Sequence, residues 1–328
     1  MLSVNFDRLP IWANSLVVVL TILVIAKGAH WLVESASQIA KRLGISELVI
    51  GLTVVALGTS APEFAVTISS AYKGQGNISV GNIVGSNIFN LGFILGGAAM
   101  FRSIPTNRLL LIRDGTLLMA ASTLLMVLIG VDLRLDRTDG LILISLLIAY
   151  LLLLFYQRRA GVEPMDETGS HLAEQGYSLA TTLALLLFGL LCVTGGSHYM
   201  VDAATAVARR LGVSEWVIGV TIVAAGTSAP ELATTLTGIL KNRYDISAGN
   251  LIGSDLFNLL GVLGLAGVLR PVGVAVEARL SIAALMGMVA MVLIFMRSGW
   301  RISRLEGFAL VLVAMARWVA DFALRATP

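Results

Sequence analysis

Two almost identical stretches of apolar sequence each place a proline directly before a glutamate. "GTSAPEF" runs from Gly58 to Phe64, and "GTSAPEL" runs from Gly226 to Leu232. Proline lacks a backbone N–H and clashes with the carbonyl one turn earlier, so a helix should kink or unwind at each stretch. Carbonyls freed inside a membrane are tolerated only where they line a cavity or are buried in protein. Each stretch is therefore predicted to present carbonyl, hydroxyl and carboxylate oxygens together.

The oxygen donors of the two stretches correspond one to one at an offset of 168 residues. They are Ala56, Thr59, Ser60 and Glu63 in the first stretch, and Ala224, Thr227, Ser228 and Glu231 in the second. Alanine contributes its freed backbone carbonyl, threonine and serine add hydroxyl groups, and glutamate adds the charge.

A second doubled motif follows each stretch, "GNIVGSNIFN" in the first half of the chain and "GNLIGSDLFN" in the second. The first places Ser86 and Asn90 four residues apart, on one face of a helix, and the second places Ser254 and Asn258 likewise. Glycines repeat every four residues in both motifs, a spacing that lets membrane helices approach closely. They are Gly81 and Gly85, with Gly249 and Gly253.

These groups together predict a site with two carboxylates and many neutral oxygens. Neither motif contains cysteine or histidine, so hard cations such as Na⁺, Ca²⁺ or Mg²⁺ suit the site better than zinc or copper. Ca²⁺ takes about 6–8 oxygen ligands. Two ionised glutamates inside a membrane would be costly to reorient unloaded, and one Ca²⁺, two or more Na⁺, or two protons would neutralise them. Ions that share ligands would exclude one another, and exchange follows from that competition.

The composition predicts that these motifs lie in membrane-spanning helices. The chain has 328 residues, of which 57% are hydrophobic and 13% charged, with a mean hydropathy of +0.87. Its net charge of +3 gives no reason to expect a nucleic-acid partner, and we expect no cofactor besides the transported ions. Ten apolar segments are long enough to cross a bilayer. Their centres lie near residues 22, 58, 90, 119, 147, 190, 226, 258, 287 and 313.

The two halves of the chain repeat each other. About thirty of the 54 aligned pairs between Leu43–Gly96 and Leu211–Gly264 are identical, without a gap. We expect one five-helix repeat at residues 1–156 (motifs at 51–96), a polar linker at 157–178 and a second repeat at 179–328 (motifs at 219–264). Because five is odd, the second repeat should enter the membrane from the opposite side. The expected fold is all-α, with ten transmembrane helices in two inverted repeats and kinked or broken helices at the midplane.

The doubled motifs resemble the α-repeats of the calcium/cation antiporter superfamily, most of all its prokaryotic sodium/calcium exchanger branch. The resemblance extends over essentially the whole chain. It implies a multi-pass protein of a prokaryotic inner membrane in which Glu63 and Glu231 bind Ca²⁺ and Thr59 and Thr227 add backbone oxygens. It also implies Na⁺ ligands and residues that line the middle of the site. The Na⁺ ligands would be Ser60, Ser86, Ser228, Ser254 and the carbonyls of Ala56 and Ala224, and the lining residues would be Asn90 and Asn258.

One residue departs from the family pattern. Members of the superfamily often carry aspartate where this chain has Asn258, whereas here the acid lies three residues earlier, at Asp255. Asp255 should point about 100° around the helix from Ser254. The sequence leaves open whether Asp255 faces the edge of the site, an entry path or another helix. Ion stoichiometry and any K⁺ dependence stay open with it.

The predicted function is a secondary antiporter that exchanges Na⁺ for Ca²⁺ by alternating access, with membrane lipid as its surroundings. The alternative is an H⁺/Ca²⁺ or K⁺-dependent Na⁺/Ca²⁺ exchanger of the same superfamily, and a cation channel is less favoured because the symmetry lies within one chain. We expect no enzyme, since the sequence lacks Gly-x-Ser-x-Gly and His-Glu-x-x-His. Orientation and oligomeric state are not fixed by the sequence.

Overall fold

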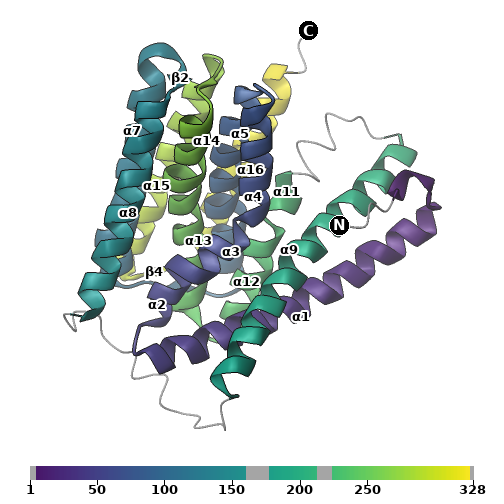
Figure 1. The fold of residues 1–328 in the computed structure, drawn as a ribbon, viewed down its shortest axis with the longest axis vertical. Coiled ribbons are helices and arrows are strands. Elements are labelled where there is room, and N and C mark those ends of the chain that lie inside the picture. Colours follow the sequence, from purple (N-terminus) through teal and green to yellow (C-terminus); the bar gives the residue numbers. More distant parts are fainter. Residues whose placement is uncertain (1–4, 160–176, 213–223, 326–328) are drawn as a thin grey trace.

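The computed structural model describes residues 5–159, 177–212 and 224–325. Long apolar helices run beside one another through most of the molecule (Figure 1). Within the described ranges, seven helical segments are long and apolar enough to cross a membrane, or eight if a bent pair counts as one span. The expected linker and the first residues of the 219–264 motif region lie largely outside these ranges, so the expected segment near residue 226 is described only in part.

The first half of the chain begins with the 3₁₀ turn η1 (Phe6–Arg8) and contains eight α-helical, three π-helical and two strand segments. They are α1 (Ile11–Leu43), α2 (Glu47–Ile50), η2 (Gly51–Val55), α3 (Ala56–Thr59), α4 (Ala61–Tyr72), α5 (Gly76–Phe89), η3 (Asn90–Leu95), α6 (Gly96–Phe101), β1 (Ile104–Pro105), η4 (Leu110–Gly115), α7 (Thr116–Asp132), β2 (Arg134–Leu135) and α8 (Arg137–Arg159).

The second half follows a similar order within the residues that are described. Its elements are α9 (Leu179–Arg210), α11 (Ala224–Thr227), α12 (Ala229–Leu240), α13 (Tyr244–Leu256), η7 (Phe257–Val262, π-helical), α14 (Leu263–Leu269), β3 (Val272–Gly273), α15 (Glu277–Gly299), β4 (Arg301–Ile302) and α16 (Arg304–Arg325).

The helix breaks lie where the prolines predict them. In the first copy, α3 ends at Thr59 and α4 begins at Ala61, and the two parts of this span meet at an angle of 50°. Pro62 lies in the first turn of α4, where its missing N–H costs no helical hydrogen bond. The second copy breaks in the same way at Ser228, between α11 and α12.

Four two-residue strands, which the sequence analysis does not predict, join the two halves of the chain. β1 pairs antiparallel with β4, so that Ile104 lies opposite Ile302. β2 pairs antiparallel with β3, so that Leu135 lies opposite Val272. Each pair therefore connects one interhelical loop of the first half to one of the second half.

Helices α1 and α9 form a long pair along one flank of the molecule (Figure 1). Glycines allow this close contact, because a Cβ placed on Gly28 would lie 2.6 Å from Cβ of Cys192 and 2.9 Å from the carbonyl oxygen of Gly189. A Cβ on Gly189 would lie 2.7 Å from the carbonyl oxygen of Gly28. The cysteine thus packs within a helix contact, as a small apolar residue would.

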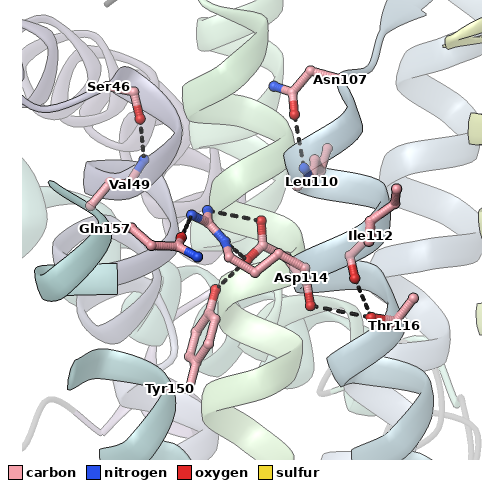
Figure 2. Close-up of polar contacts among 10 residues, drawn as sticks. Ser46, Val49, Asn107, Leu110, Ile112, Asp114, Thr116, Tyr150 and Gln157 are labelled. Atoms are coloured by element: carbon pink, nitrogen blue, oxygen red, sulfur yellow. Dashed lines mark hydrogen bonds and ion pairs between the residues drawn. The ribbon is translucent and has the colours of Figure 1, made fainter. Parts of the chain in front are cut away.

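A buried ionic cluster connects η4 to α8. Asp114 is 0% exposed and accepts hydrogen bonds from Tyr150 Oη (2.8 Å) and from Nε of the preceding residue, Arg113 (2.8 Å). The Arg113 guanidinium also donates to Oε1 of Gln157 at 2.7 Å. Figure 2 shows Tyr150 pointing at Asp114, with Gln157 on the far side of the same guanidinium group. This cluster joins residues 36 to 44 positions apart and helps to hold α8 in place.

We expect Asp114→Ala to lower the free energy of unfolding by about 3–5 kcal/mol, because the buried Arg113 charge loses its carboxylate partner. Tyr150→Phe removes one hydrogen bond to a charged group and should cost less, about 1.5–3 kcal/mol. Denaturant unfolding of both variants in mixed detergent micelles measures the two losses. Wild-type stability of Asp114→Ala would contradict this account of the cluster.

Candidate functional site

The two buried glutamates are held by serines from the opposite half of the chain. Ser60 donates a hydrogen bond to Oε1 of Glu231 at 3.4 Å, and Ser228 donates one to Oε1 of Glu63 at 3.2 Å. Both glutamates are 0% exposed. Each carboxylate therefore lies against the helix break of the other copy, close enough for the two negative charges to repel each other.

Residues before the first helix break contact the second half at the same place. The Thr59 hydroxyl lies 3.1 Å from Oδ1 of Asn250 and 3.2 Å from Oγ of Ser254. Ser254 in turn donates to the carbonyl oxygen of Ala56 at 3.5 Å. This carbonyl also accepts the Ser60 N–H at 3.1 Å, so the expectation that the break frees it is wrong, because Pro62 lacks the N–H one turn after Gly58 and not one turn after Ala56. Thr59 and Ser254 also lie beside the Glu231 carboxylate, while Thr227 lies beside that of Glu63. The predicted carbonyl, hydroxyl and carboxylate donors thus meet in one buried region.

A layer of amides and one acid lies beside the glutamates. Asn90 donates to Oδ1 of Asp255 at 3.0 Å, and Asn258 donates to Oδ1 of Asn87 at 3.1 Å. Asn87 donates to the backbone carbonyl of Asp255 at 3.1 Å. The side chain of Asp255 is 0% exposed, so of the three orientations left open by the sequence, the structure places it against helices of the other half. Among the described residues, no three His, Cys, Asp or Glu side chains cluster closely enough to hold a metal ion, so Asp255 does not join both glutamates in one group.

Two other predicted site residues are less closely described. Ser86 is buried on α5, and α11 packs on α5 as α3 packs on α13. Ala224 is the first residue of α11 and the first described after residue 212.

Several buried oxygens in this region have no hydrogen-bond partner among the described residues. They are Oε2 of Glu63, Oε2 of Glu231, Oδ2 of Asp255, Oδ1 of Asn90 and Oδ1 of Asn258. An unsatisfied buried polar group costs about 1–3 kcal/mol, and more if it is charged. The buried polar residues of the described chain are Asn, Ser, Thr, Asp and Glu, with no Lys, Arg or His. Buried Asp114 pairs with Arg113, whereas the acceptor oxygens and negative charge around Glu63, Glu231 and Asp255 would be balanced only by a cation or protons from outside.

The sequence analysis missed two asparagines of this region. Asn82 donates to the carbonyl oxygen of Glu63 (3.3 Å) and to Oγ1 of Thr67 (3.0 Å), and Asn250 contacts Thr59. Their signal was present in the sequence, because Asn82 lies four residues before Ser86, on the face that carries Ser86 and Asn90. The π-helical segments η3 and η7, which contain Asn90 and Asn258, had no sequence signal. Such bulges are frequent at functional sites.

Glycine packing brings α13 against the span that leads to the first break. A Cβ on Gly249 would lie 2.7 Å from the carbonyl oxygen of Leu48, and one on Gly253 would lie 2.7 Å from that of Leu52. The predicted close approach is confirmed for these two glycines. Among the described residues, nothing lies within 4 Å of a Cβ placed on Gly81 or Gly85.

Comparison with known families shows what kind of chain has this arrangement. The sequence profile of the family "Sodium/calcium exchanger protein" matches residues 14–156 and again residues 181–316. The chain belongs to this family. It is therefore an integral, multi-pass membrane protein of a family of transporters, and not of enzymes.

Relatives along the whole length of the chain agree with this assignment. The sodium/calcium exchanger MaX1 of Methanosarcina acetivorans is 32% identical over 349 aligned residues, which cover 95% of this chain and 99% of MaX1. The inner membrane protein YrbG of Escherichia coli is 36% identical over 254 residues, which cover 76% of this chain and 78% of YrbG. The sodium-calcium exchanger NCX_Mj, in a structure soaked with Na⁺ and Sr²⁺, superposes with a TM-score of 0.80 at 28% identity, over 94% of this chain and 98% of NCX_Mj.

We expect Gly253→Ala to destabilise the protein by about 1–3 kcal/mol, because its Cβ would press on the backbone at Leu52 and force α13 away. Gly287→Ala in α15 is the matched control, since a Cβ there meets nothing within 4 Å among the described residues. The control should keep or slightly raise stability, because alanine favours the helix more than glycine. Denaturant unfolding of both variants measures the difference, and equal effects would contradict the close contact.

Proposed function

We propose that the protein is a Na⁺/Ca²⁺ antiporter of a prokaryotic inner membrane that carries both ions at the site around Glu63 and Glu231. The observation that carries this proposal is a pair of buried carboxylates, each held by a serine of the other half and neither paired with a cationic side chain of the described chain. Beside them lie amide oxygens without a hydrogen-bond partner among the described residues. The chain also belongs to the sodium/calcium exchanger family. This donor set suits hard cations that prefer oxygen ligands.

In this proposal the two cations bind through neighbouring ligands in one buried site, and both depend on the negative charge of the two glutamates. Glu63 and Glu231 bind Ca²⁺ together with backbone oxygens of Thr59 and Thr227. Hydroxyls and backbone carbonyls bind Na⁺, and two amides line the middle. The Na⁺ ligands are Ser60, Ser86, Ser228, Ser254, Ala56 and Ala224, and the amides are Asn90 and Asn258. Asp255 contributes through its hydrogen bond with Asn90, which orients the amide.

We infer that the chain forms ten transmembrane helices in two inverted repeats, residues 1–156 and 179–328, joined by a linker at 157–178. The family profile matches the two halves separately, which supports this division. The contacts support it as well. Adding 168 to Ser60 and Glu63 gives Ser228 and Glu231, and the serine of each half bonds the glutamate of the other half. The two strand pairs are also equivalent, because β1 and β2 of the first half correspond to β3 and β4 of the second, and each strand pairs with one from the other half.

Charge balance then gives the mechanism. The unloaded site carries two negative charges and is costly to move through the membrane, whereas a site loaded with Ca²⁺ or with Na⁺ ions is neutralised and can change access. Because the carboxylates serve both cations, only one species occupies the site at a time. If more than two Na⁺ replace one Ca²⁺, each cycle moves net charge, at about 2.3 kcal/mol per charge per 100 mV.

Radioactive Ca²⁺ uptake into liposomes that contain the purified protein tests the coupling ion. The liposomes are loaded with Na⁺, with K⁺ or with a pH gradient, and the membrane potential is clamped. We expect uptake only with internal Na⁺. Uptake driven by the pH gradient alone would contradict Na⁺ coupling and assign the protein to proton-coupled exchange.

The two carboxylates are tested by Glu63→Gln and Glu231→Gln in the same assay. Each variant should lose at least about tenfold in Ca²⁺ uptake, because the site keeps its shape but lacks one of the two charges that balance Ca²⁺. Both should still insert and purify. Glu277→Gln, an exposed glutamate in the first turn of α15, is the control and should transport normally. Normal Ca²⁺ flux in either site variant would contradict the assignment of Glu63 and Glu231 as Ca²⁺ ligands.

A further inference from the structure

An ion pair fastens the end of α12 to α1. Nζ of Lys241, directly after α12, donates to Oε2 of Glu34 at 2.6 Å and lies 3.5 Å from Nε2 of His30. Closer to the helix break, Ala233 packs against a cluster formed by Ile25 and Ala29 of α1 and Val193 of α9. Helix α12 therefore lies along α1 between the carboxylate site and this end of the molecule.

The corresponding helices of the other half are apart. The counterparts of α12 and α1 at the offset of 168 residues are α4 and α9, which share few contacts. A cavity of about 900 Å³ lies between them, with Ala65 and Ser69 of α4 and Ser197 and Asp202 of α9 among its lining residues. Ala65 and Ser197 are the counterparts of Ala233 and Ala29, which pack close together in the other half.

The cavity leads toward the carboxylates. Gly226 and Thr227 line it, next to Ser228, which donates to Glu63. Pro62 lines it from the first break. The site therefore has a cavity large enough for water on its α4–α9 side, whereas on its α12–α1 side the helices are packed together.

The residues of the Lys241–Glu34 ion pair have counterparts at the offset of 168, but among the described residues these counterparts form no ion pair with each other. Lys73 and Asp202 correspond to Lys241 and Glu34, and His198 corresponds to His30. Asp202 lies 3.6 Å from His198 on its own helix, and both side chains are about half exposed. Lys73 has no hydrogen bond or ion pair with another side chain of the described chain. It lies directly after α4, four residues beyond Ser69, which lines the cavity.

We propose that Lys73 and Asp202 are positioning residues that form an ion pair in the opposite access state, where they replace the Lys241–Glu34 pair. In that state α4 closes on α9, Ala65 meets Ser197, and α12 separates from α1. The inference rests on the proposed function, because it assigns the two ion pairs to the two ends of one alternating-access cycle. An inverted repeat makes this exchange natural, since each half can adopt the arrangement of the other.

The α12–α1 contact seen in this state has more ion pairs than the proposed α4–α9 contact would have. In the state observed here, Nη1 of Arg243 also donates to Oε1 of Glu47 at 2.8 Å, which ties the α12–α13 loop to α2. The counterpart of Arg243 is Gln75, which cannot form an ion pair. Asp202 is also one methylene shorter than Glu34. The observed state should therefore be the more populated one without ions.

Cross-linking tests the exchange in the full-length protein. In a Cys192→Ser background, one variant carries Glu34→Cys with Lys241→Cys, and the other carries Lys73→Cys with Asp202→Cys. A reducible bis-thiosulfonate reagent is applied in liposomes, with Na⁺ or with Ca²⁺ and with opposite gradients. We expect both pairs to cross-link, each favoured by the opposite gradient, and each cross-link to block Ca²⁺ uptake until it is reduced. Cross-linking of the Glu34–Lys241 pair alone, under every gradient, would overturn the proposal.

Charge reversal gives a second test that needs no cysteines. Lys73→Glu and Asp202→Lys should each slow Ca²⁺ uptake by about two- to fivefold, the size expected for loss of an exposed ion pair. The double variant should recover most of the rate, which a merely structural role would not produce. Lys41→Glu, an exposed change at the end of α1, is the control and should leave uptake unchanged. Losses that simply add in the double variant would overturn the proposal.

The same experiments separate this inference from the proposed function. Robust Na⁺-dependent Ca²⁺ uptake without a Lys73–Asp202 cross-link would reject the ion-pair exchange and keep the antiporter. Alternating cross-links in a protein that moves no Ca²⁺ under any gradient would keep the ion-pair exchange and reject the proposed cargo.

Discussion

The buried charge of Glu63 and Glu231 is the constraint on which the rest of the structure depends. Two carboxylates buried in one region repel each other, and burial of each without a cationic partner is costly. The described chain offers them hydroxyl groups but no buried cation. A protein of marginal stability can keep such a pair ionised only if its folded state binds cations there, since the carboxylates would otherwise take up protons.

Neither half of the chain could build this arrangement alone. Each glutamate is held by a serine of the other half, and Asn90 is held by Asp255 of the other half. The helix breaks make these contacts possible, since they interrupt the spans at Ser60 and Ser228, whose hydroxyl groups reach the carboxylates of the other half. Close glycine packing at Gly249 and Gly253 then removes the space that water would fill. Local backbone chemistry and long-range packing thus serve the same site.

The parts that could be predicted from sequence are those with local physical causes. A proline inside an apolar helix must break it, and both breaks are observed at the expected residues. An internal repeat with glutamate in each copy indicates one shared site, and the serines and glutamates do meet across the halves. The sequence analysis also carried enough information to include Asn82 and Asn250, which follow the helical spacing of four but were overlooked.

The remaining features depend on contacts between distant residues. The side chain of Asp255 could not be oriented before its partner Asn90, 165 positions away, was placed. The Asp114 cluster requires η4 and α8 to meet at a defined register, and the strand pairs require four loops to meet across the halves. The π-helical turns at Asn90 and Asn258 arise from packing, because no residue type marks them in the way that proline marks a break.

The central claim is that Ca²⁺ and Na⁺ compete for one buried site, and equilibrium binding tests it most directly. Calorimetric titration of Ca²⁺ into the purified protein would be repeated at increasing Na⁺ concentrations and constant ionic strength. The account predicts that the apparent Kd for Ca²⁺ rises with Na⁺, more steeply than in proportion to the Na⁺ concentration, while the number of Ca²⁺ sites stays the same. Ca²⁺ affinity that is independent of Na⁺ would contradict a shared site.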